Sequence, residues 1–197
     1  MSSLLNMLAG QLDANTIKQI SSQLGADDQT TQQAINAALP MLMGALGRNA
    51  ADPAGAQALD SALQHGHDGS ILNNLAGAVT RSEVQQDGQA ILKHVLGAKQ
   101  GAVQSGIAQS TGLDAGSTGQ LLTMLAPVVL GMLGQQKQQQ GLDASGLANL
   151  LQGERQQSDQ MLSGMARLLD MDGDGDITDD VINLGSKLLG GLFGGKS

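Results

Sequence analysis

Apolar residues recur along the chain at the spacing of helices. The two most apolar stretches, residues 34–47 and 121–134, carry apolar side chains on most faces, which is typical of a buried helix. Residues 160–169 and 181–189 show amphipathic patterns instead. No stretch of useful length alternates between apolar and polar residues in the manner of a strand. The pattern therefore predicts an all-α fold.

The two buried helices lie within a longer stretch that occurs twice in the chain. Residues 16–48 align without a gap with residues 103–135, at an offset of 87 residues. The aligned pairs include two of the three prolines and several glycines: Pro40/Pro127, Gly25/Gly112, Gly44/Gly131 and Gly47/Gly134. A chance match is the alternative in a chain rich in Gly, Leu and Gln. The aligned prolines favour an internal duplication with a unit of about 60 residues.

Equivalent signals mark the ends of the repeated helix. Thr30–Gln33 and Ser117–Gln120 each fit a capping box, in which a hydroxyl accepts a backbone amide, and are expected to start the helix. Gly47 and Gly134 suit a left-handed cap at its C-terminus. Because proline lacks the amide and clashes with the preceding turn, the proline in each copy is expected to kink or divide the helix. The glycine four residues later is expected to let another helix approach closely.

The repeat divides the chain into four parts. Residues 1–63 are the first copy, residues 64–89 are a connecting helix with turns, and residues 90–155 are the second copy. Residues 156–197 contain a helix-loop-helix and a Gly-rich tail. The predicted fold is thus a duplicated, all-α multi-helix domain with kinked apolar helices and a C-terminal helix-loop-helix.

Composition and charge exclude several classes of function. The chain is 41% hydrophobic but has one Phe and neither Trp nor Tyr, so its core is aliphatic and it offers no surface for stacking nucleic-acid bases. A net charge of -8 and scattered Lys and Arg residues disfavour binding to phosphate backbones and anionic membranes. Without cysteine, disulfides and Cys-ligated zinc are excluded. We expect no nucleic-acid partner, and a membrane partner is not favoured.

Targeting signals are not evident in the sequence. The first ten residues lack both a basic segment and a sustained apolar segment, so no secretory signal is predicted. The cytoplasm is the default localisation, and secretion by a route without a signal stays open. The apolar run at residues 121–133 is shorter than the roughly 20 residues of a membrane-spanning helix and is predicted to be a buried core helix.

The stretch DMDGDGDITDD, residues 170–180, has the spacing of an EF-hand calcium loop. Such a loop supplies oxygen ligands from alternate positions and has a glycine at position 6 for the sharp turn. With Asp170 at position 1, Gly175 falls at position 6, but position 12 is Val181, which cannot ligate. We therefore expect a shortened loop that is closed by Asp180. The predicted Ca²⁺ ligands are Asp170, Asp172, Asp174, Asp176 and Asp180, with Thr178 and Asp179 as candidates for additional ligands.

Other interpretations of the acidic loop are weaker. A solvated turn that caps the next helix requires neither aspartates at positions 1, 3 and 5 nor glycine at position 6. Magnesium retains its waters and rarely uses a cage made only of protein ligands. Elsewhere, His65 and His67 offer two imidazoles to a transition metal, although a plain surface turn is the simpler interpretation.

Several short motifs occur together in this chain in a recognisable order. They are Ala38–Gly44, Pro53–Leu59, His67–Leu72, Gly88–Gly97, Leu125–Gly131 and the Asp-rich loop. Together they resemble the YidB-like family of bacterial proteins, a domain of unknown function, over nearly the whole chain. The resemblance implies a bacterial, all-helical protein and brings no established activity.

The favoured function is that of a non-catalytic, calcium-binding structural protein that associates with itself. Apolar helices with few charges, glycines suited to close approach and the apolar tail at residues 188–195 motivate the self-association. One alternative is a metal-dependent hydrolase that uses the Asp-rich loop or His65 and His67, which requires an open metal position. The other is a membrane-peripheral protein anchored by the tail, which lacks basic residues beside it.

Overall fold

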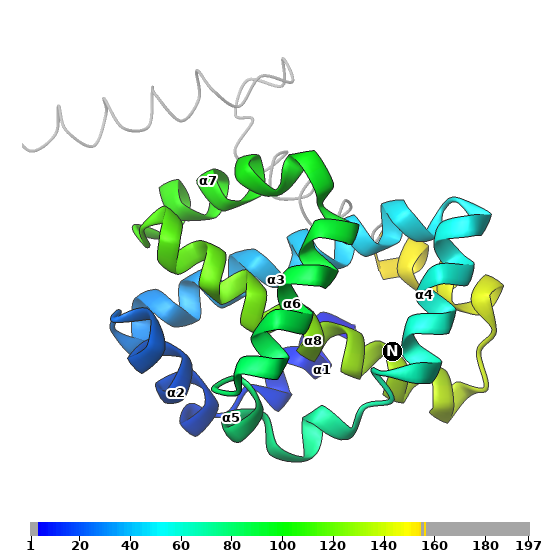
Figure 1. Ribbon diagram of the computed structural model, residues 1–197, viewed down its shortest axis with the longest axis horizontal. Coiled ribbons are helices and arrows are strands. Elements are labelled where there is room, and N and C mark those ends of the chain that lie inside the picture. The colour runs from blue at the N-terminus through cyan, green and yellow to red at the C-terminus, as the bar shows by residue number, and fades with distance from the viewer. Residues whose placement is uncertain (1–3, 155, 157–197) are drawn as a thin grey trace, which may run out of the picture. The chain divides into compact units, whose positions relative to one another are not determined.

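The structure is a computed structural model that describes residues 4–154 and 156 (Figure 1). In order, its helices are α1 (Leu4–Gln11), α2 (Ala14–Leu24), α3 (Asp28–Ala50), α4 (Pro53–His65), the 3-10 helix η1 (Ser70–Asn74), α5 (Leu75–Ala78), α6 (Ser82–Val95), the 3-10 helix η2 (Gly97–Lys99), α7 (Gln100–Thr111) and α8 (Ala115–Gln140). Residues 144–154 are also helical. The described residues contain no β-strand, which confirms the all-α prediction. The predicted C-terminal helix-loop-helix lies outside them.

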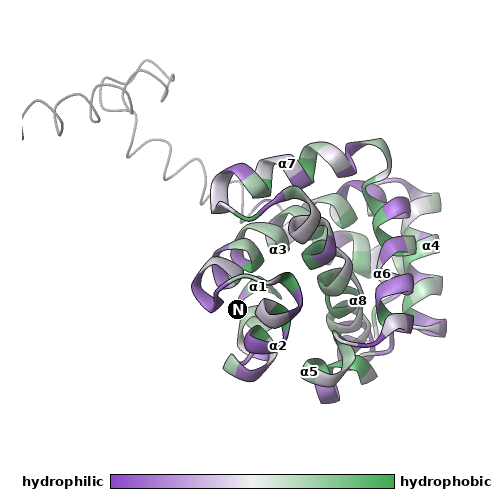
Figure 2. Cartoon of the chain, turned by 60° about the vertical axis from the view of Figure 1, so that its left-hand side comes forward, coloured by the Kyte–Doolittle hydropathy of each residue, from purple (hydrophilic) through white to green (hydrophobic). Residues whose placement is uncertain are grey.

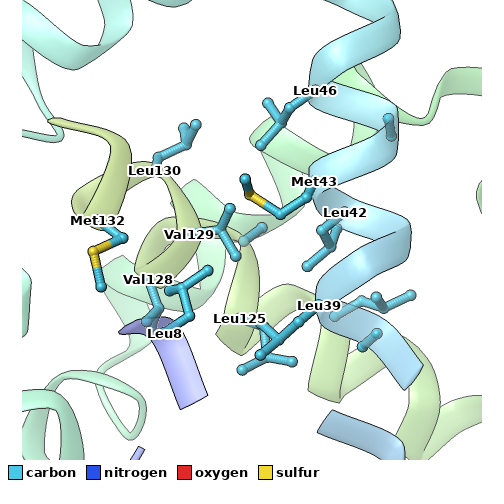
Figure 3. Packing of buried hydrophobic residues seen from close by; sticks show 14 of the residues in the cluster. Leu8, Leu39, Leu42, Met43, Leu46, Leu125, Val128, Val129, Leu130 and Met132 are labelled. Carbon is cyan, nitrogen blue, oxygen red and sulfur yellow. The ribbon is translucent and has the colours of Figure 1, made fainter. Parts of the chain in front are cut away.

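Helix α8 forms the centre of the core. It packs against α2, α3, α4, α6 and α7 and against η1. Figure 3 shows Leu39 of α3 facing Leu125 of α8, and Met43 of α3 facing Val129 of α8. The buried cluster is aliphatic and combines residues from both copies of the sequence repeat. The two copies therefore share one core instead of each forming its own.

The outer helices α4 and α6 are amphipathic. Hydrophilic and hydrophobic residues alternate in bands along both (Figure 2). On α4, the buried residues Ala56, Leu59 and Leu63 recur every three or four positions and so share one face. On α6, a Cβ atom at Gly88 would lie 1.9 Å from the carbonyl oxygen of Thr123. The absence of a side chain at this glycine is what allows α6 to approach the backbone of α8.

Helices α3 and α8 begin at equivalent positions of the sequence repeat. Their first residues, Asp28 and Ala115, are 87 positions apart. The helices before them end at Gly25 and Gly112, which adopt left-handed conformations with φ of 65° and 77°. Glycine is suited to this conformation because it has no Cβ atom. The alignment in sequence thus corresponds to an alignment of helix ends.

The prediction that Thr30 and Ser117 cap these helices is wrong by one turn. The caps are Asp27 and Asp114, whose carboxylates accept the backbone amides of Thr30 at 2.8 Å and Ser117 at 3.0 Å. The two hydroxyls donate to the second carboxylate oxygens, at 2.7 Å and 2.5 Å. A carboxylate accepts both bonds and also matches the positive end of the helix dipole. The aspartate therefore takes the cap position, and the hydroxyl supports it.

These bonds lower the pKa of both caps below its ordinary value. For Asp27 the largest cause is the backbone amide of Thr30, and for Asp114 it is the hydroxyl of Ser117. Because the folded-state pKa is depressed, the caps contribute stability at pH values above the unfolded-state pKa. That contribution is lost as the pH falls through the lowered folded-state pKa.

Neither proline divides its helix. Helix α3 continues through Pro40, and α8 continues through Pro127. A proline inside a helix costs about 3 kcal/mol, which the packing of the buried residues on either side offsets here. The predicted C-terminal caps are also wrong, because Gly47 and Gly134 lie inside the helices and α8 ends at Gly141, with φ of 64°.

The close approach expected at the glycine after each proline occurs in the second copy. A Cβ atom at Gly131 would lie 2.4 Å from Cγ2 of Ile71, in η1. At the equivalent Gly44, the nearest atom belongs to the flexible side chain of Arg48, at 3.7 Å. The glycine of α8 therefore accommodates a neighbouring segment, whereas the glycine of α3 does not.

Helix α8 is longer than the predicted core helix. Among the described residues it alone has the length and apolar composition of a membrane-spanning helix. However, 78% of its most apolar window is buried inside the fold. The packing of the core thus accounts for its apolar residues, in agreement with the predicted buried helix.

Candidate functional site

A cavity of about 310 Å³ lies between α4 and α6, with α3 and α8 adding to its lining. Small and apolar side chains form most of its surface. Helix α4 contributes Gly55, Ala58, Leu59 and Ala62. Helix α6 contributes Ala90, Ile91, His94 and Val95. The remaining lining residues are Leu46, Asn49, His67 and Leu130.

Small residues explain why this space between the helices is open. Ala58 and Ala62 are four positions apart on α4 and therefore share a face, which looks toward Ala90 on α6. Methyl groups at these positions do not reach across to the opposite helix. One turn earlier on α4, a Cβ atom at Gly55 would lie 2.0 Å from the carbonyl oxygen of Asn49, so α4 lies directly against α3 there.

Three polar side chains reach the cavity. Asn49 is half-buried, and its Nδ2 donates to the carbonyl oxygen of Val95 at 3.0 Å, which ties α3 to the end of α6. The Nδ1 atom of His67 lies 3.7 Å from Oδ2 of Asp87, and the His67 side chain is 14% exposed. His94 is exposed. The cavity is therefore mainly apolar, with polar atoms at only a few points.

The turn that carries His67 is fixed to α8. A Cβ atom at Gly134 would lie 1.8 Å from the carbonyl oxygen of His67, so the turn lies against the helix backbone. Gln138 Nε2 donates to the carbonyl oxygen of Asp68 at 3.0 Å. The Asp68 carboxylate accepts the backbone amide of Ser70 at 2.9 Å, and hydrogen bonding with Ser70 lowers its pKa. These contacts hold the imidazole of His67 in place beside the cavity.

A buried ion pair also links α4 to α8. Lys137 near the end of α8 pairs with Asp60 of α4, and their side chains are only 13% and 19% exposed. A charge pair in such surroundings requires good geometry, because removing either partner leaves the other uncompensated. The pair thus helps to fix α4 at one wall of the cavity.

The two histidines suggested as metal ligands do not form a metal cluster. The Nδ1 atom of His65 lies 2.8 Å from the carbonyl oxygen of Ser61, one turn back on α4. His67 instead faces Asp87. Within residues 4–154 and 156, no three His, Asp or Glu side chains gather in a way that could hold a metal ion. The predicted calcium ligands Asp170, Asp172, Asp174, Asp176 and Asp180, together with Thr178 and Asp179, lie outside these residues.

Comparison with known proteins provides a family. Residues 6–136 and 135–197 match a family model described as "Bacterial protein of unknown function (DUF937)". The chain belongs to the DUF937 family. The expected resemblance to a bacterial family without an established activity is therefore confirmed at that level. No curated protein and no solved structure matches this DUF937 chain.

The cavity of this DUF937 protein was not predicted from its sequence. Its polar residues come from three elements: Asn49 from α3, His67 from the turn after α4, and His94 from α6. His67 was noted in the sequence only as a candidate metal ligand and as part of a family motif, and no local pattern links these three residues. The available signal was the alanine-rich face of α4, because α6 contributes only one alanine, Ala90. Alanines at helical spacing are common on packed helices, however, and they do not by themselves indicate a cavity.

Proposed function

We propose that this DUF937 protein is a non-catalytic calcium-binding structural protein that associates with itself. The proposal is carried by the order of oxygen-bearing side chains at residues 170–180. Aspartates at loop positions 1, 3 and 5 and a glycine at position 6 match the requirements of calcium, with Asp180 in place of the missing closing residue. The proposal thus includes the finer assignment that the sequence suggests, a YidB-like protein with an EF-hand-like loop.

The charge of the loop gives calcium a structural role. Six aspartates lie within residues 170–180, and their carboxylates repel one another without a cation. Binding of Ca²⁺ relieves this repulsion and stabilises the bound form by about 2.7 kcal/mol at a hundredfold excess over Kd. In this proposal calcium has a structural role and takes no part in a reaction.

Support for self-association comes mainly from the tail. In the part of the chain that the structure describes, Met41 is the only large hydrophobic residue that is exposed. Gly88, Gly131 and Gly134 approach other segments of the same chain. The apolar residues 188–195 remain as the segment suited to contact a second copy.

Calorimetric titration of the full chain with Ca²⁺ tests the binding. We expect saturable binding that Mg²⁺ at equal concentration does not displace, and a loss of at least tenfold in affinity in Asp172→Ala. Glu83→Ala is the control, because it removes one negative charge from α6 without altering the loop. Light scattering with Ca²⁺ and with chelator then reports whether the particle size depends on calcium.

Two results would contradict the calcium site, and a third would contradict the self-association. An absence of calcium binding by the unmodified chain removes its basis. An equal loss of affinity in Asp172→Ala and Glu83→Ala shows a general effect of charge instead of a defined site. If calcium binds but the protein stays monomeric with and without it, the self-association is wrong while the calcium site stands.

A further inference from the structure

We propose that the cavity between α4 and α6 binds a small, uncharged aliphatic molecule that carries a hydroxyl group. This site is separate from the Asp-rich loop, and it does not depend on calcium. The inference rests on the size of the cavity, on its lining and on the orientation of His67.

The size of the cavity suits a small organic ligand. At about 310 Å³, it is at the lower end of the range of ligand pockets, and an apolar cavity of about 150 Å³ is sufficient to bind benzene. If each non-hydrogen atom takes about the 30 Å³ of a water molecule, the space holds about ten. The buried side chains of Leu46, Leu59 and Leu130 contribute to its lining. An aliphatic chain of this size gains by removing their surface from water.

The lining excludes a charged ligand. No Asp, Glu, Lys or Arg side chain is among the residues that line the cavity. The carboxylate of Asp87 lies close to His67 and would repel an anion. The lining thus offers a charged group no side chain of opposite charge with which to pair, so the ligand that fits it is neutral.

His67 supplies a hydrogen-bond acceptor for the ligand. It lines both the cavity and a second hollow, and Asp87 lies only in the second hollow. The Nδ1 atom of the imidazole lies 3.7 Å from Asp87 Oδ2, on the side of that second hollow. We therefore assign the opposite edge, which carries Nε2, to the cavity. The negative carboxylate favours the proton on Nδ1, which leaves Nε2 to accept. A hydroxyl group donates one hydrogen bond and matches this acceptor.

The sequence repeat allows His94, which lines the cavity on α6, to be compared with its equivalent on α1. At the offset of 87 residues, His94 of α6 is equivalent to Met7 of α1. Met7 packs toward Gln136, the equivalent of Asn49, with Nε2 3.6 Å from its sulfur. His94 instead stays exposed at the cavity. The two equivalent positions thus differ in chemistry where α6 borders the cavity.

Titration of the full chain with 1-octanol in the presence of chelator tests the proposal. Calorimetry and heteronuclear NMR should show saturable binding, with the largest shifts in α4 and α6. Ala58→Leu places a larger side chain in the cavity and should weaken the binding at least tenfold. Ala54→Leu is the matched control, because Ala54 is exposed on the same helix and does not line the cavity, and it should change the affinity less than twofold.

Two further measurements test the chemical class. Octanoate at neutral pH should bind at least tenfold more weakly than 1-octanol, because no Lys or Arg side chain lines the cavity to pair with its charge. His67→Leu should weaken 1-octanol about fivefold, as expected for one hydrogen bond. Circular dichroism of each variant establishes that it is folded.

The proposal is overturned if 1-octanol shows no saturable binding to the unmodified chain. Equal affinities of Ala58→Leu and Ala54→Leu would place the binding elsewhere on the molecule. Tighter binding of octanoate than of 1-octanol would reject the neutral ligand class, and an unchanged affinity in His67→Leu would reject the role of the imidazole.

Discussion

Helices α3 and α8 occupy equivalent places in the sequence repeat, yet their surroundings differ. Val128 of α8 is 0% exposed, whereas Met41, its equivalent on α3, is 39% exposed. Leu8 of α1 lies beside Val128 in Figure 3. On the other helix, the terminal methyl group of Met41 lies near Gly106 on α7, where a Cβ atom would be 4.0 Å from it. Equivalent sequences thus form equivalent helices that are buried to different extents.

The helices that precede the two copies also pack differently. Helix α6 has 14 residues and packs closely along α8, aided by Gly88. Helix α1 has only 8 residues, and it is equivalent to the last five residues of α6 and the three that follow. A few neighbouring residues determine where a helix ends, whereas its burial depends on which segments distant in sequence pack against it. The duplication therefore conserves local structure and leaves one copy at the centre.

Substitution by lysine at the equivalent positions 128 and 41 should reveal the difference in burial most strongly. Val128→Lys places an unpaired charge among buried aliphatic side chains, and we expect a loss of at least about 4 kcal/mol in the free energy of unfolding. Met41→Lys should cost less than about 1 kcal/mol, because a lysine at this exposed site keeps its charge in water. Urea unfolding followed by circular dichroism measures both. Similar losses would show that the two helices are buried alike.

Alanine at the equivalent glycines Gly134 and Gly47 gives the next largest difference. At Gly134 the added Cβ atom would meet the carbonyl oxygen of His67 at 1.8 Å, so the turn must shift, and we expect a net loss of about 2 kcal/mol. At Gly47 the nearest atom, the carbonyl oxygen of Leu151, lies at 3.5 Å, within ordinary contact. Alanine should therefore stabilise α3 by about 0.5 to 1 kcal/mol through its helix propensity. Thermal unfolding of both variants tests the opposite signs, and shifts in the same direction would contradict the difference in burial between the two helices.

These comparisons show which features a sequence can predict. The apolar runs around Leu39 and Leu125 predicted buried helices correctly, because a helix places its apolar positions by local geometry alone. The predicted cap was three residues too late. Asp27 and Thr30 both carry side chains that can cap the start of α3, and the carboxylate of Asp27 is the better acceptor. The sequence alone does not show which of two suitable neighbours takes the cap.

The cavity and the calcium loop differ in how far their residues lie apart in the sequence. Ala58 and Ala90 line the same cavity only because α4 and α6 both pack against α8, and no local pattern connects two alanines so far apart in the chain. The ligands of the loop, in contrast, are close together in sequence, which is why their spacing alone predicts a cation. They lie outside the described residues, and the loop stays a prediction.

The smallest expected effects concern two threonines at equivalent positions in the first turns of α3 and α8. Thr31 and Thr118 are both fully buried. Thr118 Oγ1 donates to the carbonyl oxygen of Asp114 at 2.8 Å, whereas Thr31 Oγ1 has no hydrogen-bond partner among the described residues. Valine has nearly the same shape without the hydroxyl. Thr118→Val should therefore lower the free energy of unfolding by about 1 kcal/mol, and Thr31→Val should raise it by about 1 kcal/mol.

The opposite signs of this pair test the comparison without altering the size of any side chain. A cavity or a steric clash would affect both valine variants alike, so a difference between them isolates the hydrogen bond. The double variant should lie close to the unmodified protein, because the two sites belong to different helix starts and their effects should add. If Thr31→Val is as destabilising as Thr118→Val, then Thr31 is hydrogen-bonded in solution and the two helix starts are alike in this respect too.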